Sequence, residues 1–200
     1  MKPFSLVASA AVAFILVSCD KQAQEQTVKL DLSNEELIKK GKYIVSVSAC
    51  HDCHSPKVFT AEGPEPDTTR LLSGHPKDEA LPDLGQSPAG WAMFSPGLTA
   101  SRGPWGISFA ANLTPDDTGI GNWTFDQFRT AIRKGKYKGL ENSRPLMPPM
   151  PWQMYRNFTD DDLLAVFAYL KSLKPVDNLV PTNVTPDKMQ SFIQINKASK

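Results

Sequence analysis

The sequence predicts an all-α domain in which a long loop, rich in proline and glycine, is inserted between helices. Three segments combine helix-capping residues with the apolar periodicity of amphipathic helices. The stretch 55–111 holds many of the chain's 17 prolines and 12 glycines and shows no helical or alternating period. At 200 residues, the chain suits one such domain once a short N-terminal segment is set aside.

The predicted helices run over 33–50, 124–135 and 159–174. In each, a Ser or Thr at the start is followed three residues later by Glu, Gln or Asp. That spacing lets the two side chains satisfy free backbone amides of the first turn. Gly135 stops the second helix and Pro175 stops the third, because glycine adopts the left-handed cap and proline cannot continue a helix.

The N-terminus has the features of an exported lipoprotein. Lys2 precedes an apolar run, Leu6 to Val17, which is too short to span a bilayer and has the length of a signal-peptide core. Leu16-Val17-Ser18-Cys19 resembles the bacterial lipobox, whose cysteine is lipidated after cleavage. An ordinary secretory signal and an uncleaved anchor are the alternatives. Lipid on Cys19 would hold the protein at a membrane surface, and no later stretch is apolar enough to cross a bilayer.

These features divide the chain into four predicted parts. The segment after Cys19 is polar and rich in Gln, which is typical of a flexible tether. The parts are a lipoprotein signal peptide at 1–18, a lipid-anchored tether at 19–32, a folded domain at 33–181 and a polar, poorly ordered tail at 182–200.

Cys50-His51-Asp52-Cys53-His54 reads C-x-x-C-H, the attachment signature of c-type haem. Two thiols at this spacing can both add to the vinyl groups of one haem, and the following histidine is placed to bind the iron. A zinc site would need a second pair of ligands, which the sequence lacks. A thioredoxin-like pair would follow a strand of a βαβ unit, and none is visible. We therefore expect one covalent haem c on Cys50 and Cys53, with His54 as an iron ligand.

All three cysteines then have a use. Cys19 takes lipid, and Cys50 and Cys53 take haem, so no thiol remains for a disulfide or a reactive nucleophile. This accounting favours export, because bacteria attach c-type haem outside the cytoplasm.

Several strings resemble the class I c-type cytochromes, in particular the cytochrome subunits of membrane-bound alcohol and related dehydrogenases. The resemblance covers residues 33–181 and implies a cytochrome c-like fold. Those subunits usually carry several such domains, whereas this chain carries one. The matching strings are Gly41-Lys42-Tyr43-Ile44, Cys50-x-x-Cys53-His54, Asn112-Leu113-Thr114-Pro115, Gly119-Ile120-Gly121-Asn122-Trp123-Thr124, Met150-Pro151-Trp152 and Pro175-Val176-x-Asn178.

The resemblance also implies a methionine as the second axial ligand, from a loop just before the last helix of the domain. Met150 aligns with the Met-Pro-aromatic string of the family, and its flanking prolines stiffen the loop. Met147 and His75 are the rival ligands. A proline carbonyl, that of Pro64, is the candidate to orient His54. Candidates for hydrogen bonds to a haem propionate are Trp105, Asn112, Trp123 and Arg144.

The predicted function is single-electron transfer by a membrane-tethered monohaem cytochrome on the periplasmic or outer face of a bacterial membrane. Its partners would be a dehydrogenase, an oxidase or another cytochrome. The net charge of +1 gives no reason to expect nucleic acid. No catalytic motif is visible, so we expect a carrier rather than an enzyme. The alternatives are an electron-accepting subunit of a dehydrogenase or oxidase complex and a haem sensor or peroxidase-type protein.

Overall fold

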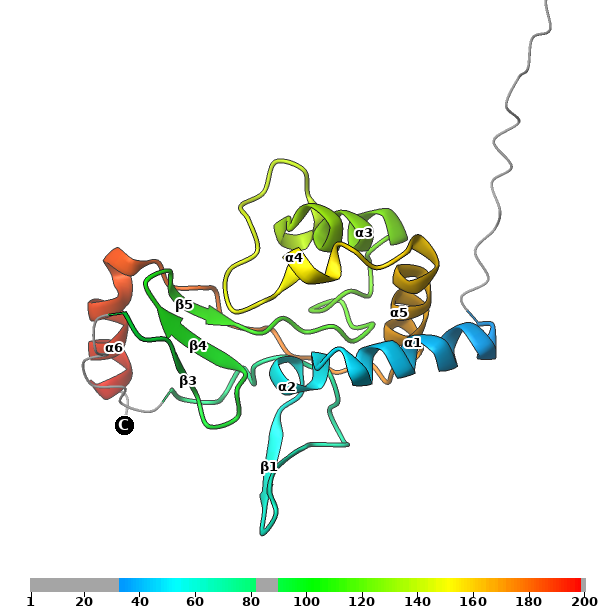
Figure 1. Ribbon diagram of the computed structural model, residues 1–200. Helices are drawn as coiled ribbons and strands as arrows, with labels where there is room; N and C mark the ends of the chain where they lie inside the picture. Colours follow the sequence, from blue (N-terminus) through cyan, green and yellow to red (C-terminus); the bar gives the residue numbers. More distant parts are fainter. Residues whose placement is uncertain (1–32, 82–89, 199–200) are drawn as a thin grey trace, which may run out of the picture. The chain divides into compact units, whose positions relative to one another are not determined.

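The computed structural model describes residues 33–81 and 90–198, which belong to one compact unit, Asp31–Lys200 (Figure 1). The predicted signal peptide, the lipobox with Cys19 and the tether lie outside the described residues. Among the helices of the described ranges, none combines the length and apolarity that a bilayer crossing requires.

The three predicted helices are present. They are α1 (Glu35–Val47), α3 (Phe125–Lys134) and α5 (Asp160–Ser172). Both α3 and α5 start with complete capping boxes, and α3 ends at a left-handed Gly135. The first helix differs at both ends: Asn34 rather than Ser33 caps its start by accepting a hydrogen bond from the Leu37 amide, and it ends at Val47 rather than at residue 50. Shorter helical pieces are α2 (Cys50–His54), η1 (Tyr137–Gly139) and α4 (Trp152–Tyr155).

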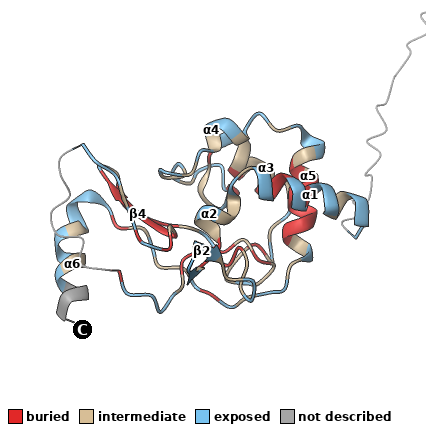
Figure 2. Ribbon diagram, turned by 60° about the horizontal axis from the view of Figure 1, so that its bottom comes forward, coloured by how far each residue is buried: buried red, intermediate tan, exposed pale blue. Residues whose placement is uncertain are grey.

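The packing of α1 against α5 forms the centre of the helical part (Figure 1). A Cβ atom on Gly41 would clash with the backbone carbonyl of Ala165, so glycine is what lets the two helices approach closely. Most of α5 is buried, as Figure 2 shows. The principal buried side chains of this helical core are Ile44, Val45, Leu72, Ile120, Phe128, Leu163, Val166, Phe167, Tyr169 and Leu170.

The region 55–111 contains β-structure where the sequence predicts only loop. A hairpin is formed by β1 (Lys57–Thr60) and β2 (Gly63–Pro66), and an antiparallel sheet of order β3-β4-β5 follows (Figure 1). The bounds of that sheet's strands are Met93–Phe94, Ala100–Gly103 and Gly106–Phe109. The all-α prediction is therefore incomplete: the fold is helical with two small sheets. Strands of two to four residues are too short to show an alternating pattern.

The segment after Pro181 is part of the fold, although its composition predicts a poorly ordered tail. Val184 and Ile107 form an antiparallel bridge, with amide-to-carbonyl distances of 2.8 and 2.9 Å. The turn η2 (Pro186–Lys188) and the helix α6 (Met189–Ala198) follow. Met189 and Phe192 pack against a second core on the three-stranded sheet, which consists of Leu81, Ala100, Ile107, Phe109 and Val184.

Candidate functional site

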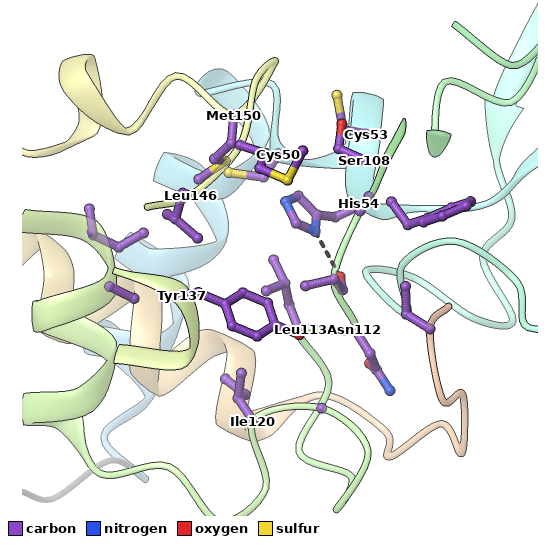
Figure 3. A pocket seen from close by; sticks show the side chains of 18 of the residues that line it. Cys50, Cys53, His54, Ser108, Asn112, Leu113, Ile120, Tyr137, Leu146 and Met150 are labelled. Carbon is purple, nitrogen blue, oxygen red and sulfur yellow. Dashed lines mark hydrogen bonds between the residues drawn. The ribbon is translucent and has the colours of Figure 1, made fainter. Parts of the chain in front are cut away.

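A cavity of about 410 Å³ lies between the helical core and the three-stranded sheet. Its volume falls within the usual range of cofactor sites, roughly 300–1,000 Å³. Most of its wall is apolar, and the groups that line it include two thiols, an imidazole and two thioethers. Figure 3 shows the side chains of Cys50, His54 and Met150 around this space. The main apolar lining comes from Ile44, Val45, Leu98, Phe109, Leu113, Ile120, Phe128, Ile132, Leu146, Leu163 and Val166.

The C-x-x-C-H motif forms a single helical turn, α2, at one wall of the cavity. The turn begins after Ala49, which has a left-handed backbone with φ of 57° and so breaks the chain direction of α1. Residues three apart share one face of a helix, and both Cys50 and Cys53 line the cavity. The Tyr155 hydroxyl donates to the Ser48 carbonyl at 2.5 Å and fixes the entry to this turn.

The imidazole of His54 is oriented by a backbone carbonyl. Its Nδ1–H donates to the carbonyl oxygen of Ala111 at 2.8 Å, which leaves Nε2 as the unprotonated nitrogen that is able to bind a metal (Figure 3). The His54 carbonyl in turn accepts from the Gly74 amide at 2.8 Å. Burial lowers the pKa of His54, which favours the neutral, ligating form. The prediction that Pro64 orients His54 is wrong, because Pro64 lies exposed in the β1–β2 hairpin.

Two buried asparagines brace the segments that hold His54. The Asn112 amide donates to the Val176 carbonyl at 2.9 Å, and its Oδ1 accepts from the Thr114 amide at 2.9 Å. The Asn178 amide donates to the carbonyls of Ser73 and His75, at 2.7 and 2.9 Å. The chain before α3 is thereby tied to the chain after α5 and to the segment beside His54.

Neither thiol has the lowered pKa that is typical of a reactive redox cysteine. Burial is the main cause that raises the pKa of Cys50 to about 11, and it also raises that of Cys53. Reactive redox thiols have lowered pKa values, because the thiolate is the nucleophile. Within the described ranges, no three His, Cys, Asp or Glu side chains gather as a metal site. Addition to haem vinyl groups remains the chemistry that the motif supports.

Two methionines, Met147 and Met150, line the cavity near α4. Among the hydrogen bonds of the described residues, none involves the sulfur of Met150. The other, Met147, accepts a hydrogen bond on its sulfur from the Asn183 amide at 2.9 Å. A sulfur held in this way is engaged by the protein rather than directed to a metal. The geometry therefore favours Met150 over Met147 as the second ligand.

The rival ligand His75 does not line the cavity. It is fully buried behind the cavity wall, where its Nδ1 pairs with the Thr99 hydroxyl at 2.8 Å and its ring lies 4.9 Å from that of Phe109. Burial lowers the pKa of His75 to about 4, so the ring is neutral at physiological pH. Its position favours a role in packing the wall.

The four residues predicted as candidates for hydrogen bonds to a haem propionate differ in whether they reach the cavity. Trp123 and Arg144 line the cavity, and the Arg144 guanidinium stacks 3.8 Å from the centre of the Tyr137 ring. Asn112 also lines it, but its amide and carbonyl are used in the bracing network. Trp105 does not reach the cavity.

Sequence reasoning missed Ala111, Tyr137 and Tyr155, all of which line the cavity. Ala111 acts through its backbone carbonyl, for which a sequence carries no signal. The aromatic ring of Tyr137 enters the cavity from the turn after α3 (Figure 3), and nothing in its sequence surroundings marks it.

The donor set fits a haem held by two thioethers. It comprises two thiols on one turn, an imidazole with a free Nε2, a thioether in the same apolar cavity, and a cation and an indole at the wall. A porphyrin is an apolar plate with two acidic groups, and these are the contacts it requires.

Comparison with known proteins points to the same cofactor. The chain is 31% identical over 140 residues to the gluconate 2-dehydrogenase cytochrome c subunit of Pantoea cypripedii. It is 30% identical over 146 residues to the cytochrome c subunit of the quinone alcohol dehydrogenase of Gluconobacter oxydans. The chain is a c-type cytochrome. These matches cover 70% and 72% of the cytochrome but only 24% and 23% of the relatives, so it spans about a quarter of their length.

A further relative matches a shorter part of the cytochrome. Over 81 residues, the cytochrome is 41% identical to one of the subunits of nicotinate dehydrogenase from Pseudomonas putida; this stretch is 40% of the present chain and 7% of that protein. No model of a protein family matches the chain.

Replacing Asn112 with Ala should lower the free energy of unfolding of the cytochrome by about 1–3 kcal/mol, because buried partners lose their hydrogen bonds. Urea denaturation followed by circular dichroism measures the change. Asn122→Ala is the control, since the Asn122 amide meets Asp117 on the exposed surface. Equal stability of the two variants would contradict a bracing role for Asn112.

Proposed function

We propose that this cytochrome carries one haem and relays single electrons at the outer face of a bacterial membrane, to which a lipid anchors it. The observation that carries the proposal is the convergence of Cys50, Cys53, His54 and Met150 on one apolar cavity. When bound, the haem supplies one-electron redox chemistry. The protein contributes the two attachment points, the axial ligands and the exclusion of water.

A closed iron site suits electron transfer. If His54 and Met150 both bound the haem iron, no coordination position would be left for a substrate. The Ala111 carbonyl holds the imidazole in place, and the apolar wall would keep water away from a bound haem. This arrangement favours a carrier over a sensor or peroxidase-type protein, which needs an open sixth position.

The partner that we propose is a membrane-bound dehydrogenase. The relatives are named as cytochrome subunits of gluconate, alcohol and fructose dehydrogenases, so they carry electrons rather than perform the substrate chemistry. Two arrangements are compatible with that role: a solitary carrier and a subunit of the dehydrogenase complex. Co-purification with a catalytic subunit from native membranes would identify the second.

Covalent attachment should be visible directly. We expect haem stain to migrate with the chain on a denaturing gel, with one haem per polypeptide by mass spectrometry. Replacing both Cys50 and Cys53 with Ala should remove the stain. A wild-type chain that stays free of haem in a host with cytochrome c maturation machinery would refute the proposed function.

The ligand role of Met150 predicts a spectroscopic change. Met150→Ala should open the sixth position, let carbon monoxide bind to the reduced protein and lower the midpoint potential, because a thioether stabilises ferrous iron. The near-infrared band of sulfur bound to ferric haem should disappear.

Met147→Ala and His75→Ala are the controls for this experiment, and both should keep the near-infrared band. If the band survives in Met150→Ala and is lost in Met147→Ala, the assignment of the ligand is wrong. If the wild-type cytochrome lacks the band and binds carbon monoxide readily, the carrier function is wrong as well.

The membrane anchor is proposed from Cys19 alone, which lies outside the described residues. We expect the mature chain to begin at Cys19, with acyl chains detected by mass spectrometry. Cys19→Ala should block processing or release the domain in soluble form, since the helices of the described ranges give no spanning segment. A processed Cys19→Ala chain that stays in the membrane fraction would exclude a lipid anchor at this residue.

A further inference from the structure

Lys57 is the first residue of β1, and its side chain points back toward α2, the turn that carries the C-x-x-C-H motif. Its ammonium donates to three backbone carbonyls: Ser55 at 2.6 Å, Asp52 at 2.9 Å and His51 at 3.0 Å. The Gly97 carbonyl, from the turn before β4, lies at 3.5 Å. A lysine ammonium has three donors, so all of them are used at hydrogen-bond distance.

The Asp52 carbonyl lies near the C-terminal end of α2 and the Ser55 carbonyl directly after it, where a helix leaves carbonyls without partners. The His51 carbonyl also accepts from the Ser55 amide, at 3.2 Å. A cation at this end interacts favourably with the helix dipole, and hydrogen bonds from a charged donor are stronger than neutral ones. Two of the three carbonyls belong to residues next to Cys53 or His54. Lys57 therefore fixes the turn that presents both a thiol and the iron-binding imidazole.

The charge of Lys57 is held beside the site, where the nearby Asp52 carboxylate attracts the ammonium without forming an ion pair with it. In the described part of the chain, no carboxylate forms an ion pair with its ammonium, whereas Lys77 pairs with Asp177 and Lys40 with Asp162. Lys57 is half-buried, and burial lowers its pKa, because desolvation disfavours the charged ammonium. The hydrogen bonds to the carbonyls offset this cost. A partly buried charge is screened less by salt than a surface one.

We propose that Lys57 is a positioning residue which holds a fixed positive charge against the attachment turn and thereby raises the midpoint potential of the haem. The inference rests on the proposed function, because it requires a haem on Cys50 and Cys53 with His54 as ligand. Reduction adds one electron to the iron, so a nearby positive charge stabilises the reduced form. The three carbonyl contacts set where that charge lies.

The test compares the midpoint potentials of the haem-loaded wild type, Lys57→Gln and Lys57→Arg by redox titration with dithionite and ferricyanide. We expect Lys57→Gln to lower the equilibrium constant for reduction about tenfold, equivalent to about 59 mV for a one-electron couple. Lys57→Arg keeps the charge and should stay near the wild type. Lys39→Gln, which removes an exposed lysine of α1, is the matched control and should leave the potential unchanged.

The near-infrared sulfur band separates this inference from the proposed function. If the wild type shows the band and one haem, but Lys57→Gln has the potential of Lys39→Gln, the role of Lys57 is refuted and the carrier function stands. A potential lowered equally in Lys57→Arg and Lys57→Gln also refutes the charge effect. If Lys57→Gln takes up no haem, Lys57→Arg decides: normal uptake and potential support the inference, and failure of both variants overturns it.

Discussion

The hydrogen bond from His54 Nδ1 to the Ala111 carbonyl joins residues 57 positions apart and determines which imidazole nitrogen faces the cavity. Two further backbone contacts continue this pairing, from Gly74 to His54 and from His75 to Ala110. The segment 73–75 is thus held between the attachment turn and the extended stretch 110–112. The side chains of Asn112 and Asn178 secure the same stretch from the other side, so the carbonyl that orients the ring of His54 is itself held in place.

The cavity separates the two cores of the domain. Ile44, Phe128 and Leu163 belong to the helical core, Ala100 and Phe109 belong to the core on the sheet, and all five line the cavity. Whatever fills the cavity therefore completes both cores at once. A plate-shaped apolar group contributes to stability here in the way that a layer of side chains does elsewhere, through burial of apolar surface.

The sequence predicted those features of the site that depend on local residues. The capping boxes of α3 and α5 need only neighbours within one turn, and these predictions are confirmed. The separate helical turn α2 was not predicted, and haem attachment at C-x-x-C-H stays a prediction. The strands between Lys57 and Phe109 were missed because each is stabilised by pairing across the chain rather than by its own composition.

Backbone contacts were equally invisible to the sequence. The carbonyl of Ala111, rather than that of Pro64, orients His54. The sequence could not predict this, because every residue has a backbone carbonyl. The bridge at Val184 was missed because its partner, Ile107, lies far away in the chain. The role of Met150 as a ligand is favoured by the contact of Asn183 with Met147 and stays a prediction.

The contact between Asn183 and Met147 has a consequence for the order of events during folding. The attachment turn needs only residues 50–54, whereas the orienting carbonyl comes 57 residues after His54 and Asn183 comes 36 residues after Met147. A newly exported chain offers its thiols before it has folded the walls of the cavity. Covalent attachment would thus precede enclosure, and the tethered haem would serve as the template on which the later segments assemble.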